Sequence, residues 1–265
     1  MSNPGPIGVF DSGVGGLSIL KEVRKLLPNE DLLYFADSAY CPYGGRPTEF
    51  IRERSLAIGR FLKAQGAKAL VVACNTASAA GLDTLRQELQ LPVVGVEPAV
   101  KPAAALSKKG KVGVLATGVT LASERFNSLL DRFCDGVEVI TQPCPGLVEV
   151  IEEGRFADAR PLLERYLTPL LRQGSTSVVL GCTHYPFLRP LVEEMAGPGV
   201  SVIDSGEAVA RQVARLLSLS SLENPGRNMG TEVFYTSGDA EAVGKVIGLL
   251  WASPAAPVAG IDLPA

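Results

Sequence analysis

The sequence predicts an α/β protein built from two pseudo-symmetric units with mainly parallel sheets. The observation behind this is that residues 66–74 (GAKALVVAC) and residues 174–182 (GSTSVVLGC) are similar apolar runs that each end in cysteine. Continuous apolar runs of this length are typical of buried parallel strands. An earlier pair, residues 7–13 and 112–118, is similar as well and keeps nearly the same spacing along the chain. We interpret the two pairs as copies of one α/β unit, related by a pseudo-twofold axis.

The first unit is expected to alternate strands with helices. A glycine-rich turn separates its first strand from its first helix, and a long loop rich in proline, glycine and tyrosine follows its second strand, where Thr48 is expected to cap the next helix. We expect strands at residues 7–10, 32–35 and 92–96 and in the run ending at Cys74, with helices at 17–27, 49–65 and 77–89.

The second unit repeats this alternation after a crossover punctuated by Pro98 and Pro102. We expect strands at residues 112–116, 137–141 and 200–204 and in the run ending at Cys182, with helices at 123–132, around 149–153, at 158–173 and after Pro186. The helices at 207–216 and 240–250 and the strand at 232–236 are expected to return to the first unit, and the tail 253–265 to be loosely ordered. The predicted domains are therefore 1–98 with 208–265, and 99–207.

Composition excludes several classes of protein. The chain has 265 residues, 46% hydrophobic and 20% charged, which is an ordinary balance for a globular protein. Its net charge of −3 gives no basic field for nucleic acid or an anionic membrane. No apolar run is long enough to span a bilayer, and the first residues contain no signal peptide, so we expect a cytoplasmic protein.

The cysteines and the single histidine, His184, give no sequence signature of a metal site. None of the five cysteines forms a C-x-x-C pair, and reduced thiols are expected in the cytoplasm. We therefore expect no bound metal. Cys41, Cys134 and Cys144 are expected to have no catalytic role.

The glycine-rich turn after the first strand reads Asp11-Ser12-Gly13-Val14-Gly15-Gly16. Its glycines do not have the G-x-G-x-x-G spacing of a dinucleotide site. They would let backbone N–H groups approach a small anion at the start of the following helix. The alternative is that these glycines only allow a tight turn between the strand and the helix and bind no anion.

Two thiols in matching positions indicate a particular chemistry. The carboxyl ends of parallel strands are where open α/β proteins bind ligands. A cysteine thiol is a competent acid or base near neutral pH. To invert a stereocentre, one group must remove a proton from one face while another returns a proton to the opposite face. A pair of like residues, one from each unit, suits this reaction because either can play either part without a cofactor.

The motifs taken together resemble the glutamate racemases of the aspartate/glutamate racemase superfamily. The resemblance covers residues 7 to about 240 and is carried by five segments: 11–18 (DSGVGGLS), 42–44 (PYG), 74–77 (CNTA), 97–99 (EPA) and 181–186 (GCTHYP). It implies two flavodoxin-like domains with the active site in the cleft between them. It also implies interconversion of L- and D-glutamate, without a cofactor, to supply D-glutamate for peptidoglycan.

The resemblance also implies a role for individual residues. Cys74 and Cys182 match the family's two catalytic thiols, with Asp11 beside the first and His184 beside the second. A glutamate assists the second thiol; the local pattern favours Glu152 over Glu149 and Glu153. The substrate contacts implied by the resemblance are Asp11, Ser12, Tyr43, Gly44, Asn75, Thr76, Thr183 and His184.

The resemblance further implies a homodimer. Relatives with an N-terminal extension can be activated by a cell-wall precursor, which we do not expect here. Three rivals remain open at this point: an aspartate or hydantoin racemase, a cysteine hydrolase that uses Cys182 with His184, and a non-catalytic protein–protein role such as binding to DNA gyrase, which no feature of the sequence supports.

Overall fold

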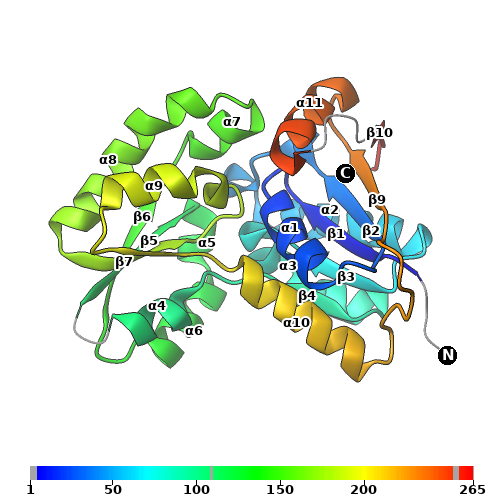
Figure 1. The fold of residues 1–265 in the computed structure, drawn as a ribbon, viewed down its shortest axis with the longest axis horizontal. Helices are drawn as coiled ribbons and strands as arrows, with labels where there is room; N and C mark the ends of the chain where they lie inside the picture. Colours follow the sequence, from blue (N-terminus) through cyan, green and yellow to red (C-terminus); the bar gives the residue numbers. More distant parts are fainter. Residues whose placement is uncertain (1–4, 108–109, 253–256, 265) are drawn as a thin grey trace.

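The computed structural model describes residues 5–107, 110–252 and 257–264. The first residues, on which the signal-peptide expectation depends, lie partly outside this range. The described strands form two separate parallel sheets, which lie side by side in Figure 1. The predicted α/β class with two sheets is thereby confirmed. In the described part of the chain, no helix is both long and apolar enough to cross a membrane.

The first sheet contains strands from both ends of the chain in the order β10-β9-β2-β1-β3-β4. Its strands are β1 (Ile7–Asp11), β2 (Leu32–Ala36), β3 (Ala69–Val72), β4 (Val93–Gly95), β9 (Glu232–Thr236) and β10 (Val258–Gly260). Helices α2 (Thr48–Ala64) and α3 (Asn75–Leu89) pack on one face. Helices α1 (Leu17–Leu26), α10 (Gly206–Leu219) and α11 (Ala240–Trp251) cover the other (Figure 1).

The second sheet has the order β6-β5-β7-β8. Its strands are β5 (Lys111–Ala116), β6 (Glu138–Pro143), β7 (Ser175–Leu180) and β8 (Ser201–Ile203). Helices α4 (Val100–Leu106) and α6 (Glu124–Phe133) pack on one face. Helices α7 (Leu147–Glu152), α8 (Ala159–Arg172) and α9 (Arg189–Ala196) cover the other.

The repeat inferred from the sequence is visible in the strand order. The central strands β2-β1-β3-β4 of the first sheet follow the same order as β6-β5-β7-β8 of the second. The strands ending before Cys74 and Cys182, β3 and β7, therefore hold equivalent places next to the first strand of their unit. The exact boundaries at 98/99 and 207/208 stay a prediction.

The structure adds to or differs from the local expectations in four places. The expected crossover at Pro98 and Pro102 contains the helix α4, whose first turn accommodates Pro102 because the first N–H groups of a helix need no internal partner. A further short helix, α5 (Gly118–Ala122), precedes α6. Thr48 is the first residue of α2 and not its cap, since Pro47 occupies the cap position.

The fourth correction concerns the tail, which was expected to be loosely ordered. Of this segment, residues 257–264 are described, and β10 extends the first sheet by pairing with β9. Its order comes from contacts distant in sequence: the Arg54 guanidinium donates hydrogen bonds to the carbonyls of Leu263 and Pro264, at 2.8 and 2.9 Å.

Candidate functional site

The two cysteines of the repeat come together at the carboxyl ends of the two sheets. Cys74 follows β3 and caps α3, where its sulfur accepts a hydrogen bond from the N–H of Ala77 at 3.4 Å. Cys182 follows β7 and precedes a short 3₁₀ turn, Tyr185–Leu188. Both side chains are buried, at 4% and 7% exposure, and both line one small cavity between the units.

Most of the residues predicted to contact the substrate line the same cavity. These are Ser12, Tyr43, Gly44, Asn75, Thr76, Thr183 and His184. Asp11 and Glu152 lie immediately behind them, hydrogen-bonded to cavity residues. The walls therefore come from both units of the repeat.

On the Cys182 side, a histidine links the thiol to a carboxylate. His184 Nδ1 lies 3.6 Å from the sulfur of Cys182, and His184 Nε2 lies 2.5 Å from Glu152 Oε1. Burial alone would lower the pKa of His184, but its hydrogen bonds to Cys182, Cys41 and Glu152 outweigh burial and raise the pKa well above its usual value. The imidazolium form is therefore favoured, with Nδ1–H directed at Cys182 and Nε2–H directed at Glu152.

On the Cys74 side, a carboxylate replaces the histidine. Asp11 is fully buried at the end of β1; its Oδ2 accepts from the N–H of Gly16 at 2.7 Å and from the Thr183 hydroxyl at 3.3 Å. Burial raises the pKa of Asp11, opposed by the charge of His184. Burial and the charge of Asp11 together raise the pKa of Cys74 well above its usual value. The first thiol is therefore held protonated.

The glycine-rich turn does present backbone N–H groups to an anion, and that anion belongs to the chain itself. Val14 N–H donates to Glu152 Oε1 at 2.6 Å. A side chain on Gly13 or Gly15 would occupy the space of the Glu152 carboxylate or the His184 ring, at 2.0 and 2.2 Å from their nearest atoms. The glycines thus permit the second unit to approach the first strand-to-helix turn of the first unit.

Tyr43 is held in the cavity wall by a buried ionic network. Its hydroxyl donates to Asp37 Oδ2 at 2.5 Å, and Arg54 pairs with the same carboxylate through Nε and Nη2, at 3.1 and 2.5 Å. Arg54 and Asp37 are completely buried. Because the remaining donor of Arg54 binds the carbonyls of Leu263 and Pro264, the C-terminal segment braces this wall.

Of the three glutamates considered for the second side, Glu152 is the one that contacts His184. Glu153 is exposed and pairs with Arg155 at 2.5 Å, while Glu149 is half-buried one turn earlier on α7. The geometry places Glu152 at the end of α7, where the chain faces the glycine-rich turn.

Sequence reasoning missed four residues of the site, one of which is Pro42 in the cavity wall. Thr117 lines the cavity, and its hydroxyl lies 3.0 Å from that of Thr76. It follows β5 as Ser12 follows β1, so the repeat itself contained this signal. Val148 also lines the cavity, and Cys41, which was set aside, lies beside His184 and Glu152.

The three donors Cys41 Sγ, His184 N and Glu152 O lie within 4.8 Å of one another and could hold a metal ion. No local sequence pattern indicated this cluster, because its members are far apart along the chain.

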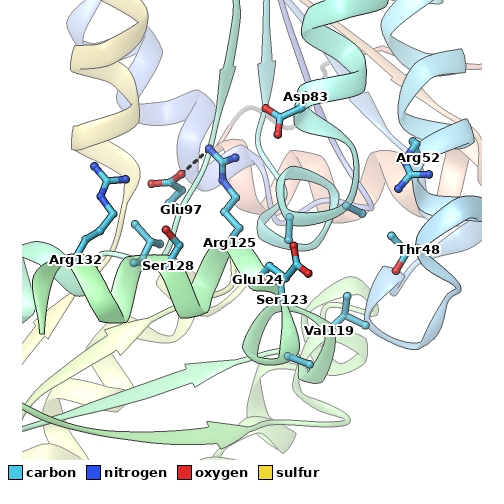
Figure 2. Close-up of a pocket in the computed structure, with 14 residues that line it drawn as sticks. Thr48, Arg52, Asp83, Glu97, Val119, Ser123, Glu124, Arg125, Ser128 and Arg132 are labelled. Carbon is cyan, nitrogen blue, oxygen red and sulfur yellow. Dashed lines mark ion pairs between the residues drawn. The ribbon is translucent and has the colours of Figure 1, made fainter.

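A larger hollow of about 890 Å³ lies between the helices of the two units, away from the thiols. Figure 2 shows its charged lining, including Arg52, Arg132 and the ion pair between Arg125 and Glu97, whose atoms are 2.6 Å apart. It contains no thiol or imidazole. The thiols and the imidazole, which can move a proton to and from carbon, line the small cavity instead.

The small cavity has a volume of only about 10 Å³. That is about the space of one water molecule. An amino acid is larger than this space, so the walls, which come from both units, must move apart for it to enter. The structure thus has the features of a closed state.

Comparison with known proteins gives consistent results. The family model Asp/Glu/Hydantoin racemase matches residues 7–213. A glutamate racemase of Pseudomonas aeruginosa is 55% identical over 251 residues, 94% of each chain. The structure of glutamate racemase isoform RacE1 from Bacillus anthracis is similar with a TM-score of 0.88, at 33% identity over 99% of both chains. The structure of Escherichia coli glutamate racemase, in complex with L-glutamate and the activator UDP-MurNAc-Ala, has a TM-score of 0.86 at 33% identity, over 99% of this chain and all of that one.

Proposed function

Because this chain belongs to the Asp/Glu/Hydantoin racemase family, we propose that Cys74 and Cys182 are the two acid–base groups with which it interconverts L- and D-glutamate. The observation that carries this proposal is that two buried thiols, one from each unit, line a single cavity. Glutamate as the substrate rests on the identity to glutamate racemases along nearly the whole chain.

The different surroundings of the thiols suggest which one acts first. His184, whose pKa is raised, can donate its Nδ1–H to the sulfur of Cys182, which lies 3.6 Å away. Cys74, with its raised pKa, retains its proton. In the L-to-D direction Cys182 removes the proton at the α carbon, and Cys74 then donates its proton to the opposite face. In the reverse direction the two exchange roles.

Neutral donors and the helix ends are suited to hold the substrate. The hydroxyls and amide of Ser12, Asn75, Thr76 and Thr183 line the cavity beside Tyr43 and Gly44, and can bind two carboxylates without adding full charges. Asp11 can receive the substrate ammonium. Fixed dipoles in a site closed to water stabilise the developing carbanion more than the same groups would in water.

Several features of the proposal extend beyond the site. We propose that the units open and close about the cavity during turnover, that the protein acts in the cytoplasm as a homodimer, and that no cofactor takes part. The D-glutamate would supply peptidoglycan synthesis. The domain boundaries 1–98 with 208–265, and 99–207, belong to the same proposal. A role with DNA gyrase has no support in the surface charge.

The test is racemisation in D₂O, followed by circular dichroism and by proton NMR at the α carbon. Each enantiomer of glutamate, with no added cofactor, is expected to yield the other with deuterium at the α carbon. If glutamate shows no exchange, aspartate and hydantoins are tried next. A trapped acyl-enzyme with a dispensable Cys74 would instead support a hydrolase built on Cys182 and His184.

A further inference from the structure

Three side chains from separate segments converge at the edge of the cavity. Cys41 belongs to the loop after β2, Glu152 to the end of α7, and His184 to the segment after β7. One donor atom from each, a sulfur, an oxygen and a ring nitrogen, lies within 4.8 Å of the other two. The cluster thus joins the first unit to the second.

This donor set matches the preferences of one kind of cation. Zinc binds thiolate sulfur at about 2.3 Å and imidazole nitrogen or carboxylate oxygen at about 2.0–2.2 Å, in a tetrahedron. Two such nitrogen and oxygen ligands are then about 3.4 Å apart by tetrahedral geometry. Glu152 Oε1 and His184 Nε2, now hydrogen-bonded at 2.5 Å, would have to separate by less than an ångström. A sulfur ligand disfavours magnesium and calcium.

We propose that Cys41, Glu152 and His184 form a binding site for a thiophilic divalent cation, Zn²⁺ being the best match. Three protein ligands leave the fourth position open, the arrangement found where zinc can also take water or a small anion. His184 is buried, whereas Cys41 and Glu152 are partly exposed.

Occupation of the site has a chemical cost that sets its strength. Binding transfers the thiol proton and one imidazolium proton to solvent, because the metal takes thiolate and neutral imidazole. The cation therefore competes with protons for these ligands.

The functional consequence is inhibition, and this part rests on the proposed racemase function. A cation on His184 replaces the imidazolium beside Cys182 and ties Cys41 of the first unit to Glu152 and His184 of the second. Since the cavity can admit substrate only when the units separate, the ion would hold the enzyme closed as well as disable one thiol.

The experiment measures binding directly, so that it does not depend on activity. Zinc binding to the reduced full chain is measured by equilibrium dialysis for the unmodified protein, Cys41→Ser, Cys41→Ala and Cys134→Ser. Cys134 is a matched control because it is also a partly exposed free thiol, but belongs to the second unit outside the cluster. Cobalt is then used as a probe, since a thiolate bound to Co²⁺ gives a charge-transfer band in the near ultraviolet.

One zinc per chain is expected for the unmodified protein and for Cys134→Ser. Loss of an outer hydrogen-bonding partner of a metal ligand costs about 10–100-fold in affinity, so loss of the Cys41 ligand should cost at least about 100-fold. The cobalt band should disappear in both Cys41 variants, although Cys74 and Cys182 are retained. Zinc should inhibit racemisation reversibly in the unmodified protein and at least about 100-fold less strongly in Cys41→Ser, each relative to its own metal-free rate.

The outcomes separate this proposal from the function of the enzyme. Absence of stoichiometric zinc from the unmodified protein, or a cobalt band and affinity that persist in both Cys41 variants, would overturn the site even if racemisation is normal. Stoichiometric, Cys41-dependent binding without glutamate racemisation would support the site and refute only the proposed function.

Discussion

Replacing Glu152 by glutamine tests the arrangement on which the second thiol depends. The side chain keeps its size but loses its charge. It thereby loses the charge assistance of the two hydrogen bonds that Glu152 Oε1 accepts, from Val14 N–H at 2.6 Å and from His184 Nε2–H at 2.5 Å. The contact with Val14 joins the two units, and the contact with His184 supports the imidazolium beside Cys182. The variant therefore perturbs the charge of His184 without removing a thiol or the imidazole.

The size of the effect follows from these contacts. A hydrogen bond to a charged group contributes about 1.5–3 kcal/mol, and the amide oxygen of glutamine can still accept the bond from Val14. The expected loss is thus that of one charged bond, about 10- to 100-fold in kcat/KM, at about 1.4 kcal/mol per factor of ten. Enantiomers have equal free energies in water, so the loss must be the same in both directions.

The variant should also move the pH dependence. The hydrogen bond to Glu152 is among the causes that raise the pKa of His184, after burial, which lowers it, and the bonds to Cys182 and Cys41. Removal of the carboxylate charge lowers that pKa. His184 therefore loses its proton at lower pH, and the alkaline limb of the rate profile shifts downward. Because the chain has a single histidine, nitrogen NMR of the imidazole reports this pKa directly.

The assay is circular dichroism of racemisation from either enantiomer, with Glu153→Gln as the matched control. Glu153 is the next residue but is exposed and paired with Arg155, so its substitution should leave kcat/KM within a factor of about two, as for a surface ion pair. Full activity and an unchanged histidine titration in Glu152→Gln would refute the reasoning. Equal losses in both variants would point to a general disturbance of α7.

Three further predictions concern the cavity wall and the thiols. Cys74→Ser and Cys182→Ser should each lower racemisation by about 10²–10⁴-fold. In D₂O, Cys74→Ser should exchange only the α proton of L-glutamate. Cys182→Ser should exchange only the α proton of D-glutamate. In Gly15→Ala the new carbon would lie 2.2 Å from the imidazole of His184, so activity should fall. Overpacking of this kind typically costs about 1–3 kcal/mol of stability. The control Gly45→Ala, whose new carbon would meet nothing within 4 Å, should retain activity. Arg54→Met strands a buried carboxylate and should lower the free energy of unfolding in urea by about 3–5 kcal/mol.

Local patterns predicted the alternation of strands and helices and the two units, because buried strands and amphipathic helices carry their periodicity in their own residues. The elements that were missed depend on other information. β10 lies in a tail of proline, alanine and glycine, and its order comes from pairing with β9 and from the donors of Arg54. The helix α4 was not predicted because it contains Pro102. Proline usually interrupts a helix but is compatible with its first turn.

The glycine-rich turn shows the limit of a motif read in isolation. Its composition predicted backbone N–H groups that approach a small anion, and in the structure the Val14 N–H donates to Glu152. It could not indicate that the anion is Glu152, supplied by a unit more than a hundred residues away. Likewise Cys41 contains no signal of its own, and only the folded chain brings it next to His184. Sequence periodicity predicts individual strands and helices, but it carries no information about which residues of the two units come into contact.

The two copies of the unit have diverged where the chemistry needs them to differ. The repeat aligns Cys74 with Cys182, but it aligns Asp11 with Ala116 and Thr76 with His184. A strictly symmetric site would give both thiols the same neighbours, and so the same protonation state, whereas racemisation needs one thiol and one thiolate at the start of each turnover. The substituted neighbours make the two sides unlike: a buried carboxyl raises the pKa of Cys74, whereas the ring of His184 lies 3.6 Å from the sulfur of Cys182. In the proposed mechanism, the repeat supplies one thiol from each unit, and the different neighbours let one act as the acid while the other acts as the base.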